Sequence, residues 1–348
     1  MRLYQLIRLT CLAGLLAALL ASAIPQATAP HEQLSAYGFF TGDIARQLPA
    51  ADVTPYQLNT PLFSDYAEKL RFVRLPPGTK ATYNSDSVFS FPVGTTLIKT
   101  FYYPHDFRDP SKGRRLMETR LLIHEANGWK AWTYIWNAEQ TDAYLEVAGD
   151  KQPVQFVDPK GKTVSFDYIV PNQNQCKGCH NTYEVLTPIG PGARQLNGDF
   201  AYARGKENQL QHWIKAGLLS GLDDVSRAPK APVWNDPQSG TLEARARTWL
   251  DINCAHCHKP GGPASTSGLF LQIAEKDPTK MGVMKTPVAA GRGAANLLYD
   301  IVPGHPDQSI LVYRMLSTDP GIMMPELSRK LTHHEGIALV QEWIKKMK

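Results

Sequence analysis

The sequence Cys176-Lys-Gly-Cys179-His180 recurs later in the chain as Cys254-Ala-His-Cys257-His258. Two thiols three residues apart lie on one turn, so each can form a thioether with a vinyl group of the same porphyrin, while the next residue directs its imidazole to the iron. A C-x-x-C-H run is therefore typical of c-type haem attachment. We predict two covalently bound haem c groups. The residues that hold them are Cys176, Cys179, Cys254 and Cys257 as covalent attachments and His180 and His258 as axial iron ligands.

A methionine is the candidate sixth ligand of the second haem iron. Met323-Met324-Pro325 follows the second run at some distance, and the proline restricts the backbone next to Met324. A thioether is neutral and favours ferrous iron, so it raises the reduction potential. We predict Met324 as this ligand, with Met323 and then Met315 as the alternatives.

The sixth ligand of the first haem iron stays open. No methionine lies between the first run and residue 240. His212 is a candidate because it lies on a short helical run downstream. The other possibilities are an open or water-bound iron, or a methionine from elsewhere in the fold, namely Met281, Met284 or Met117.

Four cysteines in two C-x-x-C pairs also match a Cys₄ zinc site. Such a site does not require a histidine directly after each second cysteine, yet both pairs have one. Haem is therefore favoured over zinc. The candidate methionine ligand and the export signal described below favour haem as well. Two short-loop disulfides are a further alternative that the same features disfavour.

Amphipathic helices are expected on both sides of the second run. Leu242, Ala246 and Trp249 lie on one apolar stripe of a helix over 241–252, which leads directly into Cys254. A second amphipathic helix is expected over His334–Met347. Small cytochrome c domains close with two such helices that cross each other. We therefore expect residues 241–348 to form a cytochrome c domain around the second haem.

The stretch 32–170 has a β-strand pattern, because short apolar or alternating runs are broken by turn residues. Asn127-Gly128 predicts a hairpin, and Asp158-Pro-Lys-Gly161 predicts a second turn. The expected strands cover 70–75, 88–91, 96–103, 118–124, 130–136 and 163–169. The aromatic and histidine residues of this stretch have no metal or catalytic spacing.

These patterns predict a multidomain α+β fold. An N-terminal β-sandwich-like domain over 32–170 is followed by two mainly α-helical cytochrome c-like haem units. The first unit covers 171–227 and includes a helix over Asn208–Ala216. Residues 228–240, with three prolines, form a linker, and the second unit covers 241–348.

Residues 1–23 have the pattern of a secretory signal peptide, with Arg2 and Arg8 before an apolar core and Ala21-Ser22-Ala23 as the cleavage site. The apolar core is too short for a membrane span, which needs about 20 residues. We expect an exported, periplasmic protein with no integral membrane segment in the mature chain. Cys11 precedes most of the apolar core, which disfavours it as a lipidation site.

The charge of the chain does not indicate a nucleic-acid partner. The formal net charge is +5 at pH 7 over 348 residues, and the propionates of two haem groups would offset it. Lys112–Arg115 is a small basic cluster that could meet an acidic redox partner.

Several further stretches resemble a family of exported bacterial dihaem c-type cytochromes with a β-rich N-terminal half. They are Leu62–Ala67, Phe91–Thr95 with Lys99–Phe101, Glu118–Leu122, Trp132–Asn137, and Gln195–Asn197 with Asn208–Leu210. In the C-terminal part, Pro303–Ser309, Arg314, Met324-Pro325 and Trp343-Ile344 are similar to single-domain cytochromes c. The resemblance implies haem and export, and it brings no particular reaction with it.

Taken together, these features predict a periplasmic protein that transfers single electrons between redox partner proteins. The alternative is a haem enzyme, such as a dihaem peroxidase, with an open site at the first haem. A third possibility is a binding or sensory protein whose β-rich domain recognises a ligand.

Overall fold

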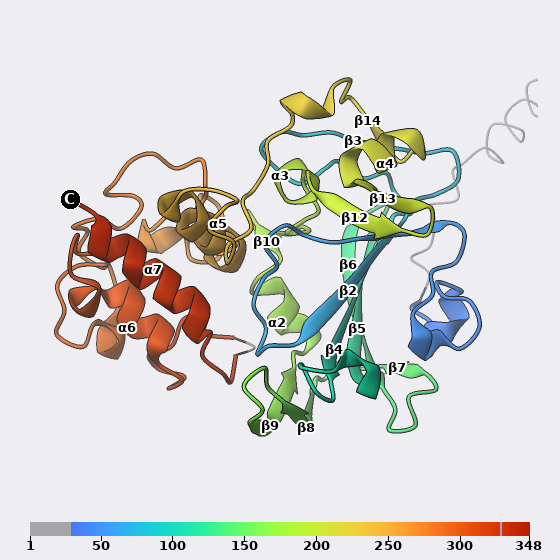
Figure 1. Cartoon of the computed structure of the whole chain (residues 1–348), viewed down its shortest axis with the longest axis horizontal. Coiled ribbons are helices and arrows are strands. Elements are labelled where there is room, and N and C mark those ends of the chain that lie inside the picture. The colour runs from blue at the N-terminus through green and yellow to red at the C-terminus, as the bar shows by residue number, and fades with distance from the viewer. Residues whose placement is uncertain (1–28, 328) are drawn as a thin grey trace, which may run out of the picture. The chain divides into compact units, whose positions relative to one another are not determined.

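One antiparallel sheet dominates the described part of the chain, with its strands in the order β1-β2-β4-β5-β6-β7 (Figure 1). This computed structural model describes residues 29–327 and 329–348, and His31–Lys348 forms one compact unit. The six strands are β1 (Val53–Tyr56), β2 (Glu68–Arg74), β4 (Thr96–Pro104), β5 (Arg114–Glu125), β6 (Gly128–Trp136) and β7 (Ala143–Leu145).

The hairpin between β5 and β6 confirms the turn expected at Asn127-Gly128. Glu125 pairs with Gly128 across this turn. Gly128 has a φ of 108°, a conformation that glycine adopts without steric cost because it has no Cβ.

The two faces of the sheet have different surroundings, because successive side chains of a strand point to opposite faces. On one face, Phe72, Ile98 and Leu121 stand in register on β2, β4 and β5. They are buried against the 3₁₀ helices η1 (Leu34–Tyr37) and η2 (Ile44–Arg46). The opposite face of the same strands borders the cavity described below.

Four two-stranded ladders accompany the sheet within the described residues. The β8–β9 hairpin packs on the sheet through Tyr103 and Phe156, whose stacked rings have centroids 5.1 Å apart. The pairs are β8 (Asp150–Val157) with β9 (Thr163–Val170), β3 (Ala81–Thr82) with β14 (Leu219–Ser220), β10 (Asn181–Thr182) with β11 (Val185–Leu186), and β12 (Asp199–Tyr202) with β13 (Gly205–Asn208).

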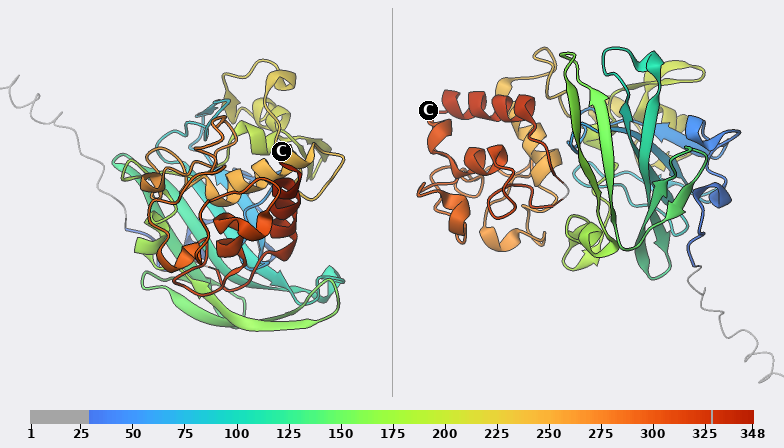
Figure 2. Two further views of the ribbon diagram at one scale, coloured as in Figure 1. Left: turned by 90° about the vertical axis from the view of Figure 1, so that its left-hand side faces the viewer. Right: turned by 90° about the horizontal axis from the view of Figure 1, so that it is seen from below.

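The helices are short in the middle of the chain and longer near its end. Trp249, Leu250, Val340 and Ile344 lie in the buried cluster that joins α5 to α7. Figure 2 shows the ribbon of this C-terminal part, with α7 in red. The α-helices described are α2 (Gln173–Lys177), α3 (Ala193–Leu196), α4 (Gln209–Lys215), α5 (Leu242–Cys254), α6 (Ile310–Leu316) and α7 (His334–Lys346). The remaining 3₁₀ helices are η3 (Pro110–Lys112), η4 (Val225–Arg227), η5 (Ser265–Ser267), η6 (Gly291–Ala294) and η7 (Pro306–Gln308).

The expectation of two mainly α-helical cytochrome c-like units behind a β-sandwich-like domain is wrong. Segment 171–227 has the short α-helices α2, α3 and α4 and the 3₁₀ helix η4 between small strands, and its β14 pairs with β3 of the β-rich part. In segment 241–348, short 3₁₀ helices, turns and isolated bridges separate α5 from α6. The β-rich part is one large sheet with two-stranded ladders. Apolar periodicity identifies single helices, but it does not report how much irregular chain lies between them.

Most of the individual elements agree with the sequence patterns. The strands expected over 70–75, 96–103, 118–124, 130–136 and 163–169 fall in β2, β4, β5, β6 and β9, whereas 88–91 forms only isolated bridges. The three expected helices correspond to α4, α5 and α7.

Two further expectations concern the segments between and before these elements. The segment 228–240 is held to the fold, since Ala231 N–H donates to Arg194 O (2.7 Å) and Thr60 Oγ1 donates to Pro232 O (2.7 Å). The expected signal peptide, 1–23, lies outside the described residues. Among residues 29–327 and 329–348, no helix has the length and apolar character needed to cross a membrane.

Candidate functional site

The residues before the first C-x-x-C-H run start the helix that presents it. Asn172 Oδ1 accepts from Gln175 N–H (2.8 Å), and Asn172 N–H donates to Gln175 Oε1 (2.9 Å), which is a reciprocal capping box. Gln173 Nε2 donates to Ala131 O (3.2 Å) and so fastens α2 to β6. At the end of this turn, His180 N–H donates to Cys176 O (2.9 Å).

The second run forms the same backbone turn at the end of a longer helix. Thr241 Oγ1 accepts from Ala244 N–H (3.1 Å) and caps the start of α5. At the other end, His258 N–H donates to Cys254 O (2.9 Å). In each run, a hydrogen bond across one helical turn therefore joins the first cysteine to the histidine.

Both histidines of the runs are oriented through Nδ1. His180 Nδ1 lies 3.3 Å from Thr187 O. Because a carbonyl oxygen only accepts, Nδ1 carries the proton and Nε2 has a free lone pair. His258 Nδ1 lies 3.4 Å from Ser267 Oγ. Metal-binding histidines are commonly held in this way, with the second ring nitrogen bonded to the protein.

Burial keeps both imidazoles neutral. It lowers the pKa of His180 to about 3, and the positive charge of Lys99 acts in the same direction. Burial also lowers the pKa of His258 to about 4. The neutral imidazole is the form that coordinates a metal.

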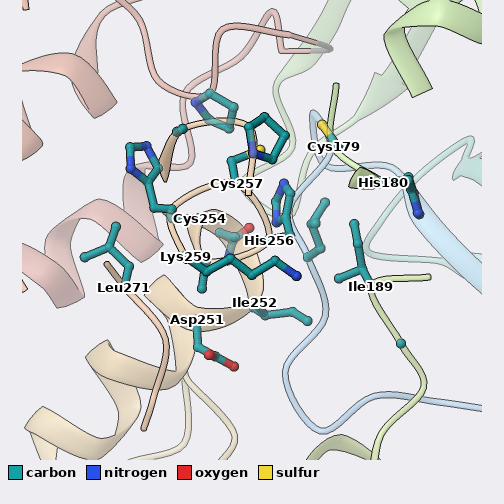
Figure 3. A pocket seen from close by; sticks show the side chains of 18 of the residues that line it. Cys179, His180, Ile189, Asp251, Ile252, Cys254, His256, Cys257, Lys259 and Leu271 are labelled. Atoms are coloured by element: carbon teal, nitrogen blue, oxygen red, sulfur yellow. The ribbon is translucent and has the colours of Figure 1, made fainter. Parts of the chain in front are cut away.

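The two runs come together although they are far apart in the sequence. Tyr183 N–H donates to Gly261 O (2.7 Å), and Cys257 Sγ lies 3.5 Å from Gly178 O. Ligand atoms of Cys179, His256 and Cys257 all lie within 4.8 Å of one another (Figure 3). The neighbouring Cys257 side chain lowers the pKa of the Cys179 thiol, and Cys179 in turn raises the pKa of Cys257.

One large cavity contains both runs. Its volume is about 1030 Å³, and every cysteine and histidine of the two C-x-x-C-H runs lines it. This volume lies at the upper end of the range of about 300–1,000 Å³ that small-molecule pockets occupy. The sheet contributes Arg71, Lys99, Arg120 and Trp132 to the lining, and the C-terminal part contributes Met315 and Met324.

The candidate sixth ligands have different locations. Met324 lines the cavity, and its N–H donates to Arg314 O (3.0 Å). Met323 is buried and does not line the cavity. Of the remaining methionines, Met315 lines the cavity as part of the buried cluster of α5, α6 and α7. Met117, Met281 and Met284 are not among the lining residues.

His212 lies away from this cavity. Its ring stacks on Tyr202, with centroids 3.5 Å apart, and its Nδ1 lies 2.7 Å from Glu207 Oε1. In contrast, His256 lines the cavity between the two runs, and its Nδ1 is buried without a hydrogen-bond partner among the described residues. His256 lies inside the second run, but the C-x-x-C-H spacing indicates roles for its neighbours Cys257 and His258 and none for His256 itself.

A loop of the β-rich part contacts the C-terminal part beside the second run. Phe63 N–H donates to Asn253 Oδ1 (2.8 Å), directly before Cys254. Asp65 accepts from the N–H groups of Lys330 (2.9 Å) and Leu331 (2.7 Å), a few residues after Met324. The stretch Leu62–Ala67 therefore positions both the second run and the segment that follows the candidate methionine.

The charged floor of the cavity is the main feature that the sequence patterns did not reveal. Arg71, Lys99 and Arg120 lie on three strands that the sequence identifies only as strands. Pairing register, which joins residues distant in the chain, brings them together.

Comparisons of the chain with protein families, with curated proteins and with solved structures found no match.

Proposed function

We propose that this protein is a dihaem c-type cytochrome that transfers single electrons between redox partner proteins outside the cytoplasm. The observation that carries the proposal is that both C-x-x-C-H turns and Met324 line one cavity. Cys176, Cys179 and His180 would hold one haem. Cys254, Cys257, His258 and Met324 would hold the other.

The residues present suit such a cofactor. The cavity is large, and both candidate proximal histidines are neutral with Nδ1 engaged by the protein. The Nη2 atom of Arg71 is buried in the cavity wall without a hydrogen-bond partner among the described residues, as expected beside a missing polar group. When bound, haem c supplies a one-electron iron couple, and a methionine ligand raises its potential.

This chain would contribute rigidity to such a site. Each histidine sits on a helical turn closed by a 2.9 Å hydrogen bond. The neighbouring contact between Tyr183 and Gly261 holds the two turns against each other. Rigid surroundings of this kind would suit electron transfer by two haem groups, because few protein groups would need to rearrange when the charge of an iron changes.

Zinc binding is the second candidate, and one observation favours it. Cys179, His256 and Cys257 place two sulfur ligands and one nitrogen ligand within 4.8 Å of one another, and this donor set suits zinc. Such a site would use only part of the two runs. It would leave Cys176, Cys254, His180, His258 and Met324 without a role.

The test is covalent haem content after production in a host that matures c-type cytochromes. We expect haem staining on a denaturing gel and two haems per chain by pyridine haemochrome assay. The pair Cys176→Ser with Cys179→Ser should halve the haem content, and so should Cys254→Ser with Cys257→Ser. Bound zinc without haem in the wild-type chain would refute the proposal.

The optical and EPR spectra of the oxidised holoprotein separate the carrier from a haem enzyme. Two low-spin irons that do not respond to cyanide or peroxide support electron transfer alone. A high-spin iron that responds to peroxide would instead indicate a reaction site at the haem on His180.

A further inference from the structure

A row of polar side chains crosses the cavity face of the sheet. Tyr56, Arg71, Lys99, Arg120 and Thr133 are paired in register on β1, β2, β4, β5 and β6. Residues that pair directly in antiparallel strands point to the same face. All five side chains therefore stand side by side, and all five line the cavity.

Of the three basic side chains in the centre of this row, only Arg120 has an anionic partner among the described residues. Glu118 is fully buried and binds Arg120 through both oxygens, with Nε–Oε2 2.8 Å and Nη2–Oε1 2.5 Å. Tyr168 donates to the same carboxylate (2.6 Å). The hydrogen-bonding capacity of Glu118 is thus used by Arg120 and Tyr168, and none is directed to Arg71 or Lys99.

Arg71 and Lys99 have no ion pair or side-chain hydrogen bond among the described residues. Arg71 is only 6% exposed, and its Nη2 is buried without a partner. Lys99 Nζ lies 4.6 Å from the centroid of the Phe101 ring. Like charges directly opposite each other on a sheet are destabilising, and a buried charge is ordinarily paired.

The acidic residues that line the cavity are engaged elsewhere. Asp251 accepts from Ile273 N–H (2.9 Å), Asp300 pairs with Lys285 (3.3 Å), and Glu326 lies 3.6 Å from Arg314. Asp86, the remaining one, accepts from Ser85 (2.7 Å). Among the described residues, no carboxylate that lines the cavity therefore pairs with Arg71 or Lys99. Burial lowers the pKa of Lys99 well below its usual value, and a carboxylate from outside the described chain would favour its charged form.

The row ends beside the first C-x-x-C-H run. Thr133 lies on β6, two residues from Ala131, whose carbonyl oxygen accepts from Gln173 of α2. Cys176 and His180 of the same turn line the cavity together with the row. A cofactor held by this turn would thus lie over the row or next to it.

We propose that Arg71 and Lys99 form a binding site for carboxylate groups on the floor of the cavity. This inference rests on the proposed function, under which the carboxylates are propionates of the haem held by Cys176, Cys179 and His180. Guanidinium and ammonium groups both form strong charge-assisted hydrogen bonds with carboxylates. A diffusible small carboxylate has the same chemistry and is the other possible source.

The experiment compares four variants of the full-length holoprotein: Arg71→Gln, Lys99→Gln, Lys99→Arg and Lys80→Gln. Lys99→Arg keeps the positive charge. Lys80→Gln is the matched control, because Lys80 is exposed and does not line the cavity. Circular dichroism verifies folding. Spectroelectrochemistry then gives the midpoint potential of each haem, and calorimetry measures the binding of sodium succinate.

If the propionates are the ligands, Arg71→Gln and Lys99→Gln lower the potential of one haem and leave the other unchanged, because removing a nearby positive charge favours ferric iron. Lys99→Arg and Lys80→Gln then have little effect, and succinate does not bind. If a diffusible carboxylate is the ligand, the wild type binds succinate and Lys99→Gln weakens that binding by about tenfold or more.

The inference is wrong if neither the potentials nor succinate binding respond to Arg71→Gln and Lys99→Gln in folded protein. The proposed function fails separately, if the wild type contains no covalent haem. If the wild type lacks haem, succinate titration of the haem-free chain and of its Lys99→Gln variant still tests the carboxylate site.

Discussion

Asp65 offers a sharp test of how the β-rich part holds the C-terminal part. Its carboxylate accepts from Lys330 N–H and Leu331 N–H at 2.9 and 2.7 Å. The residue is 2% exposed and has a φ of 50°. Burial raises the pKa of Asp65, although the two backbone N–H groups act in the opposite direction.

We expect Asp65→Ala to lower the free energy of unfolding by about 4 kcal/mol. A hydrogen bond to a charged group contributes about 1.5–3 kcal/mol. The lower end applies here because Lys330 is exposed, so losing the two bonds costs about 3 kcal/mol. Alanine in the left-handed region adds about 1 kcal/mol.

Asp65→Asn is the matched control. Asparagine keeps one acceptor oxygen, tolerates a positive φ and avoids the burial of a charge. We expect it to lower the free energy of unfolding by about 1 kcal/mol. Both variants remove the charge, so the difference between them reports the lost acceptor together with the backbone effect of alanine at a positive φ.

Urea unfolding followed by tryptophan fluorescence measures both effects, and an unchanged m-value shows that the same surface unfolds. If Asp65→Ala costs less than about 1 kcal/mol, or no more than Asp65→Asn, the assigned contact does not hold the two parts together. If Met324 is an iron ligand, as proposed, Asp65→Ala should also weaken the methionine-to-iron charge-transfer band of the haem-loaded protein, because the anchored residues follow Met324 closely. Asp65→Asn should retain that band.

Three further predictions concern helix packing, pH and the buried ion pair. Gly336→Ala should lower the melting temperature, because a Cβ there would overlap the Trp249 indole; overpacking costs about 1–3 kcal/mol, and a gain in stability would contradict this packing. Asp106→Asn should destabilise the protein at pH 7, because hydrogen bonds from neighbouring cations hold the pKa of Asp106 well below its usual value. The Asp106 carboxylate stabilises the fold fully above its unfolded-state pKa of about 3.9, and this stabilisation is lost as the pH falls through the lower folded-state pKa. The melting temperatures of wild type and variant should therefore converge in acid. A difference in melting temperature that stays constant with pH would contradict this prediction. Glu118→Gln should destabilise the haem-free chain by about 3 kcal/mol in urea unfolding, because Arg120 loses its buried partner. An unchanged unfolding midpoint would show that water already solvates the Arg120 guanidinium group.

The elements next to the two C-x-x-C-H runs could be predicted because they depend on neighbouring residues. The apolar stripe that includes Trp249 indicates α5, and the structure places its end at Cys254. The helix over Asn208–Ala216 is present as α4. The direction of its His212 side chain, toward Tyr202 and Glu207, depends on β12 and β13 and has no signal in the periodicity.

The error in fold class has a related cause. α2 has five residues and α3 has four, which is too short for a periodic pattern. α2 is held by its capping box and by the contact of Gln173 with β6. Such helices follow from tertiary packing, so the C-x-x-C-H motif does not predict how helical the surrounding segment 171–227 is.

The sequence by itself determined most of the local elements of this protein. The two C-x-x-C-H runs, the helix that ends at Cys254 and most strands of the sheet follow from spacing and periodicity over a few residues. Only the tertiary structure decided that both runs line one cavity with Met324. It also placed Arg71, Lys99 and Arg120 side by side. The physical reason is that strand register and loop contacts join residues far apart in the chain, and no local pattern encodes which distant partner a residue will meet.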